Sequence, residues 1–266
     1  MASPLSTVRR LRQLAAHVRR ALPRPASAIV QVGRLALEVD PRTEIGYVLW
    51  RDQGFEARER DVAAALFASR GTERAIVDVG AHVGIHALAW AKMFAKAPVV
   101  AIEPAPDTVA QLARNVKRNG LHGRVRVLEC ALGERAGDGA LRIATDDAYS
   151  GLLETGRKPV RAVVSVRIRT LDEIAGELPV PLGLVKIDVE GHERAVIAGG
   201  RATIERDRPV LFVEIYGGVA SNPAPEATVQ EIRALGYTAY VLGPHGLEPF
   251  THHDDRRYNY FFVPKS

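Results

Sequence analysis

The stretch that decides the fold runs from Ala75 to His86 and reads AIVDVGAHVGIH. Its first five residues are apolar apart from Asp78, which is typical of a strand buried in a parallel sheet. Gly80 and Gly84 then mark a turn, and helical spacing begins at the second glycine. Open α/β sheets bind ligands where such a strand ends and such a helix begins. The stretch therefore predicts an α/β fold with a ligand site at this turn.

A second stretch of the same design follows one strand–helix unit later. Residues 99–103 read VVAIE, and a helix is expected from Pro106 onward. This places Glu103 at the carboxyl end of the second strand, next to the first turn. An acidic side chain in that position can accept hydrogen bonds from both hydroxyls of a ribose. The two strands together predict a cofactor that contains a ribose.

The glycine spacing and the charge indicate which cofactor fits. A dinucleotide site needs three glycines in the pattern GxGxxG so that backbone N–H groups reach a pyrophosphate, but this turn has only Gly80 and Gly84. Asp78 would repel a diphosphate and accept a hydrogen bond from an ammonium group. S-adenosylmethionine carries an ammonium, a cationic sulfonium and a ribose without phosphate, so the residues favour it over NAD. Taken alone, the first motif would also suit an ordinary strand-to-helix turn.

Further motifs follow in order along the chain. They are IEPAPD at 102–107 with Leu112, Asn115 and Asn119 behind it, CALG at 130–133, KIDVEGHE at 186–193 and FVEI at 212–215. With VDVGAHVGIH at 77–86, they make residues 54–217 resemble the FkbM-type family of S-adenosylmethionine-dependent methyltransferases. The sequence departs from the family in the first turn, where His82 stands in place of a common asparagine.

The resemblance implies a class I methyltransferase fold, which is a Rossmann-like, mostly parallel seven-stranded sheet with helices on both faces. It also implies O-methylation of a hydroxyl on a sugar, glycolipid or natural-product acceptor, with nitrogen acceptors as an alternative. The residues that would then bind the cofactor are Asp78, Gly80, Ala81, His82, Gly84, Glu103, Ala131 and Asp188.

Four titratable residues follow the fourth and fifth strands of the expected sheet, namely Asp188, Glu190, His192 and Glu214. We expect them to converge because the carboxyl ends of parallel strands meet at one edge. Methyl transfer to oxygen requires that the acceptor is aligned and loses its proton as it attacks. We expect His192 to be the base because imidazole titrates near neutrality, Asp188 to orient the acceptor or the methionine ammonium, and Glu214 to assist.

Simpler explanations exist for the same residues. Glu190 would interact favourably with a helix N-terminus, and His192 would be an exposed first-turn residue. Lys186, within the apolar run before Asp188, is expected to pair with a neighbouring carboxylate or to extend toward solvent. The four titratable residues Asp188, Glu190, His192 and Glu214 would together also suit Mg²⁺. We treat a metal site as the less favoured alternative.

The composition indicates one large domain with appendages. The chain has 266 residues, of which 47% are hydrophobic, enough for one full core. The single cysteine, Cys130, excludes an internal disulfide framework. We find no long apolar span and no secretory signal pattern, so we expect a cytoplasmic protein.

The positive charge is concentrated at the N-terminus. Residues 1–37 contain seven arginines and no acidic residue. Apolar residues recur at helical spacing from Leu5 to Leu22. We expect residues 1–24 to form a basic amphipathic arm that either makes peripheral contact with an anionic membrane or packs on its own domain. Nucleic acid is disfavoured because no stacking aromatics alternate with the arginines.

The remaining pattern divides the chain into an N-terminal cap at 25–70 and a methyltransferase domain at 71–266. In the cap we expect short strands within 28–39 and 47–50 and a helix at 55–69. Strands and helices alternate over 75–130 and again after 184, which is typical of a parallel sheet with crossover helices. Glycines and β-branched residues within 133–170 predict an inserted β-hairpin that overhangs the site.

Two functions from other classes are alternatives. An NAD-dependent oxidoreductase would share Glu103, but it is disfavoured by the missing third glycine and by Asp78. A non-catalytic, membrane-associated scaffold of the same fold would have no need for convergent acids such as Asp188 and Glu214.

Overall fold

The computed structural model describes residues 22–217, 224–253 and 256–265. The expected basic arm at 1–24 therefore lies almost wholly outside the described residues. Within these ranges, every helix is too short or too polar to cross a membrane.

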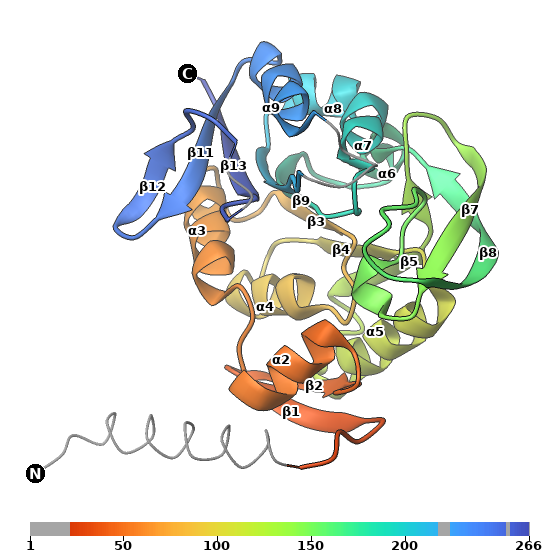
Figure 1. The fold of residues 1–266 in the computed structure, drawn as a ribbon. Helices are drawn as coiled ribbons and strands as arrows, with labels where there is room; N and C mark the ends of the chain where they lie inside the picture. The colour runs from red at the N-terminus through yellow and green to blue at the C-terminus, as the bar shows by residue number, and fades with distance from the viewer. Residues whose placement is uncertain (1–21, 218–223, 254–255, 266) are drawn as a thin grey trace, which may run out of the picture.

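An eight-stranded sheet forms the centre of the molecule (Figure 1). Its strands lie in the order β12 (Gly246–Pro249), β11 (Tyr237–Gly243), β13 (Asn259–Pro264), β10 (Val210–Glu214), β9 (Leu182–Ile187), β3 (Ala75–Val79), β4 (Val99–Glu103) and β5 (Val125–Glu129). The strands from β10 to β5 are parallel, whereas β13 is antiparallel to both β10 and β11. The expected Rossmann-like sheet is confirmed with one strand more than predicted. The additional strand, β12, is a short and half-buried edge strand without the apolar alternation that would reveal it.

Helices cover both faces of this sheet, as expected (Figure 1). One core contains Ile76 and Leu184 together with side chains from α3 (Ala57–Ala68), α4 (Ile85–Met93) and α5 (Pro106–Arg118). The other contains Val77 and Val185 together with α6 (Leu171–Gly176), α7 (Glu193–Gly199), α8 (Arg201–Asp207) and α9 (Pro225–Ala234). Alternate residues of each central strand thus enter opposite cores, because side chains alternate across a strand.

The N-terminal part differs from the prediction in one element. The hairpin of β1 (Ala28–Val32) and β2 (Leu35–Val39) supplies the first expected strands, but the strand expected at 47–50 is wrong. Those residues belong to α2 (Glu44–Asp52). Thr43 caps this helix by accepting a hydrogen bond from the Gly46 amide, and Leu49 is buried on one side. The cap and the helical burial outweigh the strand propensity of the aromatic and β-branched residues.

The inserted hairpin is confirmed. The strands β7 (Gly137–Ala144) and β8 (Val160–Arg169) pair antiparallel, and β6 (Ala131–Leu132) joins β8 in a separate three-stranded sheet. The connection between β7 and β8 contains a short 3₁₀ turn, η1 (Asp147–Tyr149). This sheet leaves the main one directly after β5, so its connection reaches the carboxyl ends of the central strands (Figure 1).

Asn115 joins the N-terminal hairpin to the domain that carries the first turn. Its side chain in α5 is fully buried and accepts a hydrogen bond from the Glu38 amide at 2.6 Å. Its amide group donates to the carbonyl oxygens of Glu38 at 3.1 Å and of Val83 at 2.9 Å. One side chain thus satisfies backbone groups of both β2 and the turn.

We predict that Asn115→Ala lowers the free energy of unfolding by about 2–4 kcal/mol, because it leaves buried backbone groups without partners. Gln111→Ala is the control, since Gln111 is half-buried on the same helix and makes a single bond to the Glu38 carbonyl oxygen. Urea unfolding of both variants measures the difference. An equal loss in the two variants would contradict the role assigned to Asn115.

Candidate active site

The turn after β3 is shaped by the close approach of the segment that follows β9. Gly80 has φ +76°, and a Cβ on it would lie 1.8 Å from the backbone oxygen of Asp188. The Asp188 amide in turn donates to the Val79 carbonyl oxygen at 3.1 Å. Gly84 starts α4 with φ +91°. Only glycine fits the first of these positions, since it needs both the conformation and the absent side chain.

Glu103 ends β4 beside this turn. One carboxylate oxygen accepts from the His82 amide and the other from the Ala105 amide, each at 3.0 Å. His82 reaches this position with φ +49°, a conformation that residues other than glycine rarely adopt. Burial raises the pKa of Glu103, while His82 and the two amides oppose the rise. The turn and the carboxylate are therefore held as one unit.

A pocket lies over the carboxyl ends of β3, β4 and β9. Of the predicted cofactor residues, those that line it are Gly80, His82, Glu103, Ala131 and Asp188. The other three, Asp78, Ala81 and Gly84, are absent from its lining. Ala81 is buried and donates its amide to the Ile102 carbonyl oxygen. These three residues shape the turn instead of facing the pocket.

Asp78, which we expected to contact an ammonium group, lies behind the turn and outside the pocket lining. It is fully buried, and its carboxylate accepts from the Ala87 amide of α4 at 2.9 Å. Because side chains alternate along β3, Asp78 shares the face of Ile76, which packs toward α4. The carboxylate thereby stabilises the first turn of the helix that follows the pocket.

A buried lysine connects Asp78 with Asp188. Lys186 stands opposite Asp78 in the pairing of β9 with β3. Its Nζ donates to the Asp188 carboxylate at 3.0 Å and lies 3.7 Å from Asp78 Oδ1. Burial alone would disfavour the charge, but Asp188 and Asp78 raise the pKa of Lys186 above the usual lysine value. The lysine therefore stays protonated between the two carboxylates.

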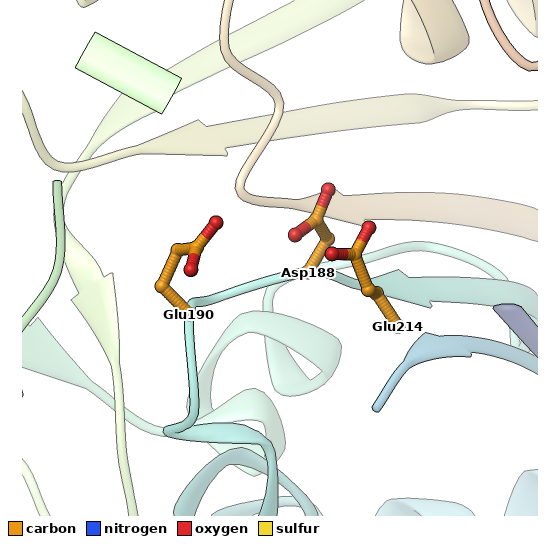
Figure 2. A group of neighbouring side chains, drawn as sticks. All are labelled: Asp188, Glu190 and Glu214. Carbon is orange, nitrogen blue, oxygen red and sulfur yellow. The ribbon is translucent and has the colours of Figure 1, made fainter. Parts of the chain in front are cut away.

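Three of the four groups expected at the strand ends do converge. Asp188, Glu190 and Glu214 each have a carboxylate oxygen within 4.8 Å of the others (Figure 2). Burial and the nearby Asp188 raise the pKa of Glu190 to about 7, against the opposing effect of Arg157. Burial raises the pKa of Glu214 well above its usual range, and Asp188 adds to the rise. Within this carboxylate cluster, Glu190 is therefore poised to gain and lose a proton near neutral pH.

His192 lies outside the carboxylate cluster, although it lines the same pocket as Asp188 and Glu190. Glu190 and Gly191 have positive φ angles that turn the chain between Asp188 and His192. His192 lines the pocket instead, and a Cβ on Gly133 would lie 3.4 Å from its Nε2 atom. Burial lowers the pKa of His192 and favours its neutral form.

The carboxylate cluster has the oxygen atoms that Mg²⁺ prefers. Two of its three members are already bonded to cations, however. Asp188 accepts from Lys186 at 3.0 Å, and Glu190 accepts from Arg157 at 2.8 Å. These bonds compensate much of the negative charge that a metal ion would otherwise balance.

The connection between β7 and β8 forms a roof over the pocket. Asp147, Ala148 and residues 150–152 line the pocket from this side. His82 Nε2 lies 3.3 Å from Asp147 Oδ1, and Asp147 helps to raise the pKa of the largely buried His82 above its usual value, against the effect of burial. Tyr149 donates to Glu44 of α2 at 2.7 Å. The roof therefore contacts both the turn and the N-terminal part of the chain.

Sequence reasoning missed two further charged residues near the carboxylate cluster. Arg157 belongs to the roof and bonds Glu190. Glu56, at the start of α3, accepts from the Asn259 side chain at 2.8 Å and lies 3.4 Å from His86 Nε2. Neither residue belongs to a sequence motif, and both are far in the sequence from the residues that they contact.

Comparisons with known proteins agree with this architecture. The sequence model described as "Methyltransferase FkbM domain" matches residues 78–239. The chain is 33% identical over 175 residues to "Hexuronic acid methyltransferase AglP" of Haloferax volcanii, covering 64% of this chain and 67% of that protein. It is 27% identical over 148 residues to "2-O-methyltransferase NoeI" of Sinorhizobium fredii, covering 50% of this chain and 60% of that protein.

Among solved structures, the chain resembles a methyltransferase FkbM from Methylobacillus flagellatus, with 18% identity and a TM-score of 0.49 over 76% of this chain and 47% of that one. The sequence matches do not favour an NAD-dependent oxidoreductase or a non-catalytic scaffold. The family match covers more than half of the chain and includes the turn, Glu103 and the carboxylate cluster. The chain therefore belongs to the FkbM family of methyltransferases.

Proposed function

We propose that this protein transfers a methyl group from S-adenosylmethionine to a hydroxyl oxygen of a sugar-containing acceptor. The observation that carries the proposal is the charge of the pocket. Its lining has four carboxylates and, among the described residues, no lysine or arginine. Such a lining suits a cationic ligand without phosphate, since the four carboxylates would repel a pyrophosphate. The names of the two relatives, a hexuronic acid methyltransferase and a 2-O-methyltransferase, support the acceptor class.

The residues of the pocket fit the proposed cofactor in chemical type. Glu103 is the acid that would accept ribose hydroxyls, and Gly80, which has no side chain, lines the pocket with its backbone. When bound, S-adenosylmethionine supplies a methyl group on a positively charged sulfur. Asp188 then provides a fixed negative charge at the pocket wall, because Lys186 holds it in place.

We assign proton removal from the acceptor hydroxyl to the carboxylate cluster, with Glu214 as the base. A carboxylate with a raised pKa is a stronger base than an ordinary one, and burial raises the pKa of Glu214. Glu190 and Asp188 are each bonded to a cation, whereas Glu214 ends its strand beside them. His192 remains the alternative base, since burial favours its neutral form.

We predict that S-adenosylmethionine and S-adenosylhomocysteine raise the melting temperature of the protein, whereas NADH at the same concentration does not. A ligand at about 100 times its Kd stabilises the folded state by about 2.7 kcal/mol. Thermal unfolding monitored by fluorescence measures the shift. Stabilisation by NADH alone would reject the proposed cofactor.

We predict that Glu103→Ala weakens S-adenosylhomocysteine binding by about 1–3 kcal/mol, because hydrogen bonds to a charged carboxylate are lost. Glu129→Ala is the matched control, since Glu129 pairs with Glu103 in register on the neighbouring strand and lies outside the pocket. Calorimetry on folded variants measures both affinities. An equal effect of the two substitutions would argue against a ribose contact by Glu103.

We predict that Glu214→Gln lowers the single-turnover rate by about 10²–10⁴-fold, with S-adenosylhomocysteine affinity nearly unchanged. A base acts in its deprotonated form, and the pKa of Glu214 is raised. The wild-type rate should therefore fall as the pH drops through a midpoint above the usual glutamate range. Glu214→Gln should lose this dependence, and His192→Ala should keep it. The reverse pattern would return the role to His192.

A further inference from the structure

A second cleft lies at the same edge of the sheet as the cofactor pocket. It is bounded by the residues that lead into α3, by the end of β11 and by the segment before β13, and its lining includes Phe55, Glu56, Tyr258 and Asn259. The start of α3 and these two strands are neighbours in the fold (Figure 1). The cleft is therefore built jointly by the N-terminal part and the C-terminal strands.

The strand directions place the carboxylate cluster between this cleft and the pocket. Since β13 is antiparallel to both β10 and β11, the ends of β10 and β11 and the start of β13 share one edge. Glu214 pairs with Asn259 in register at that edge. The pocket lies over β3, β4 and β9, whereas the cleft lies over β13 and β11. Asp188 and Glu214 occupy the strand ends between them.

Side-chain contacts connect the cleft with the carboxylate cluster. Asn259 donates to Glu56 at 2.8 Å, and the charge of Glu56 contributes to the raised pKa of Glu214 after burial and Asp188. The ring of Tyr258 meets that of Tyr216 edge-on at 5.8 Å. The Arg157 guanidinium lies 4.6 Å from the centre of the Tyr216 ring and also bonds Glu190. An aromatic and polar wall thus extends from the cleft to the reacting groups.

The lining of the cleft fits one chemical class of ligand. It combines aromatic rings with carboxylate, amide and guanidinium groups, supplied by Tyr258, Glu56, Glu59, Asn259 and Arg256. A sugar ring has C–H faces that pack on aromatic rings and hydroxyls that exchange hydrogen bonds with polar groups. A purely apolar ligand would leave the charged groups desolvated.

We propose that this cleft binds the sugar ring of the methyl acceptor and presents one of its hydroxyls to Glu214. The proposal rests on the proposed function, because the acceptor and the cofactor must meet at the carboxylate cluster. It names Tyr258 as the stacking residue and Asn259 and Glu56 as partners of the sugar hydroxyls.

Methyl glucoside and methyl glucuronoside serve as probe sugars, since they share a ring and differ in the charge at carbon 6. Saturation-transfer NMR on the full chain, with and without S-adenosylhomocysteine, detects their binding. We expect saturation transfer to the ring protons of at least one probe sugar. In Tyr258→Leu we expect the affinity for that probe to be about three- to tenfold weaker, which corresponds to the loss of one aromatic contact. If the wild type prefers the glucuronoside and Arg256→Gln abolishes this preference, the acceptor is acidic. If the two probes bind equally well, the acceptor is neutral.

Two further variants separate binding from folding. Ala57→Trp adds bulk to an exposed residue that lines the cleft and should block both probes while leaving S-adenosylhomocysteine affinity unchanged. Tyr47→Leu removes a half-buried tyrosine outside the cleft and should change neither. Absence of probe binding to the wild type, or binding unaffected by Ala57→Trp and Tyr258→Leu, would overturn the proposal. Failure of the wild type to bind S-adenosylhomocysteine would instead count against the proposed cofactor.

Discussion

The buried ammonium of Lys186 is the interaction on which the rest of the site depends. It faces Asp78 across the β3–β9 pair and bonds Asp188 at the end of its own strand. Asp78 in turn holds the first turn of α4. The Lys186 ammonium therefore helps to fix both α4, through Asp78, and the carboxylate of Asp188. Removing any member of such a buried group leaves an uncompensated charge, which typically costs several kcal/mol.

Local patterns predicted most of the fold because most of its strands and helices carry their own signal in the sequence. The apolar runs at β3, β4 and β9, each followed by a turn and a helix, indicated a parallel sheet without any knowledge of contacts. The errors in the predicted elements arose where the sequence pattern was weak and a helix cap or tertiary packing decided the structure. Tyr47 and its neighbours resemble a strand by propensity, yet Thr43 starts a helix there. The edge strand β12 buries too little to show a pattern.

The site was predictable in position but only partly in detail. Acids at the ends of β3, β4, β9 and β10 follow from strand topology, since parallel ends meet at one edge. Which way an acid faces depends on alternation and on the next helix, so Asp78 turned out to lie behind the turn. His192 lies outside the carboxylate cluster, because Glu190 and Gly191 have positive φ angles that redirect the chain before it. Arg157 and Glu56 come from distant segments, and no short motif announces them.

The roof between β7 and β8 has a consequence for kinetics. It is fastened to the turn through His82 and Asp147, to α2 through Tyr149 and Glu44, and to the strand ends through Arg157 and Glu190. Lifting it breaks contacts with all three, so the free energy of this local opening exceeds that of an ordinary surface loop. Amides under the roof should exchange with solvent late, and the residence time of any ligand beneath it is then set partly by α2, which itself contributes Ile45 to the pocket lining.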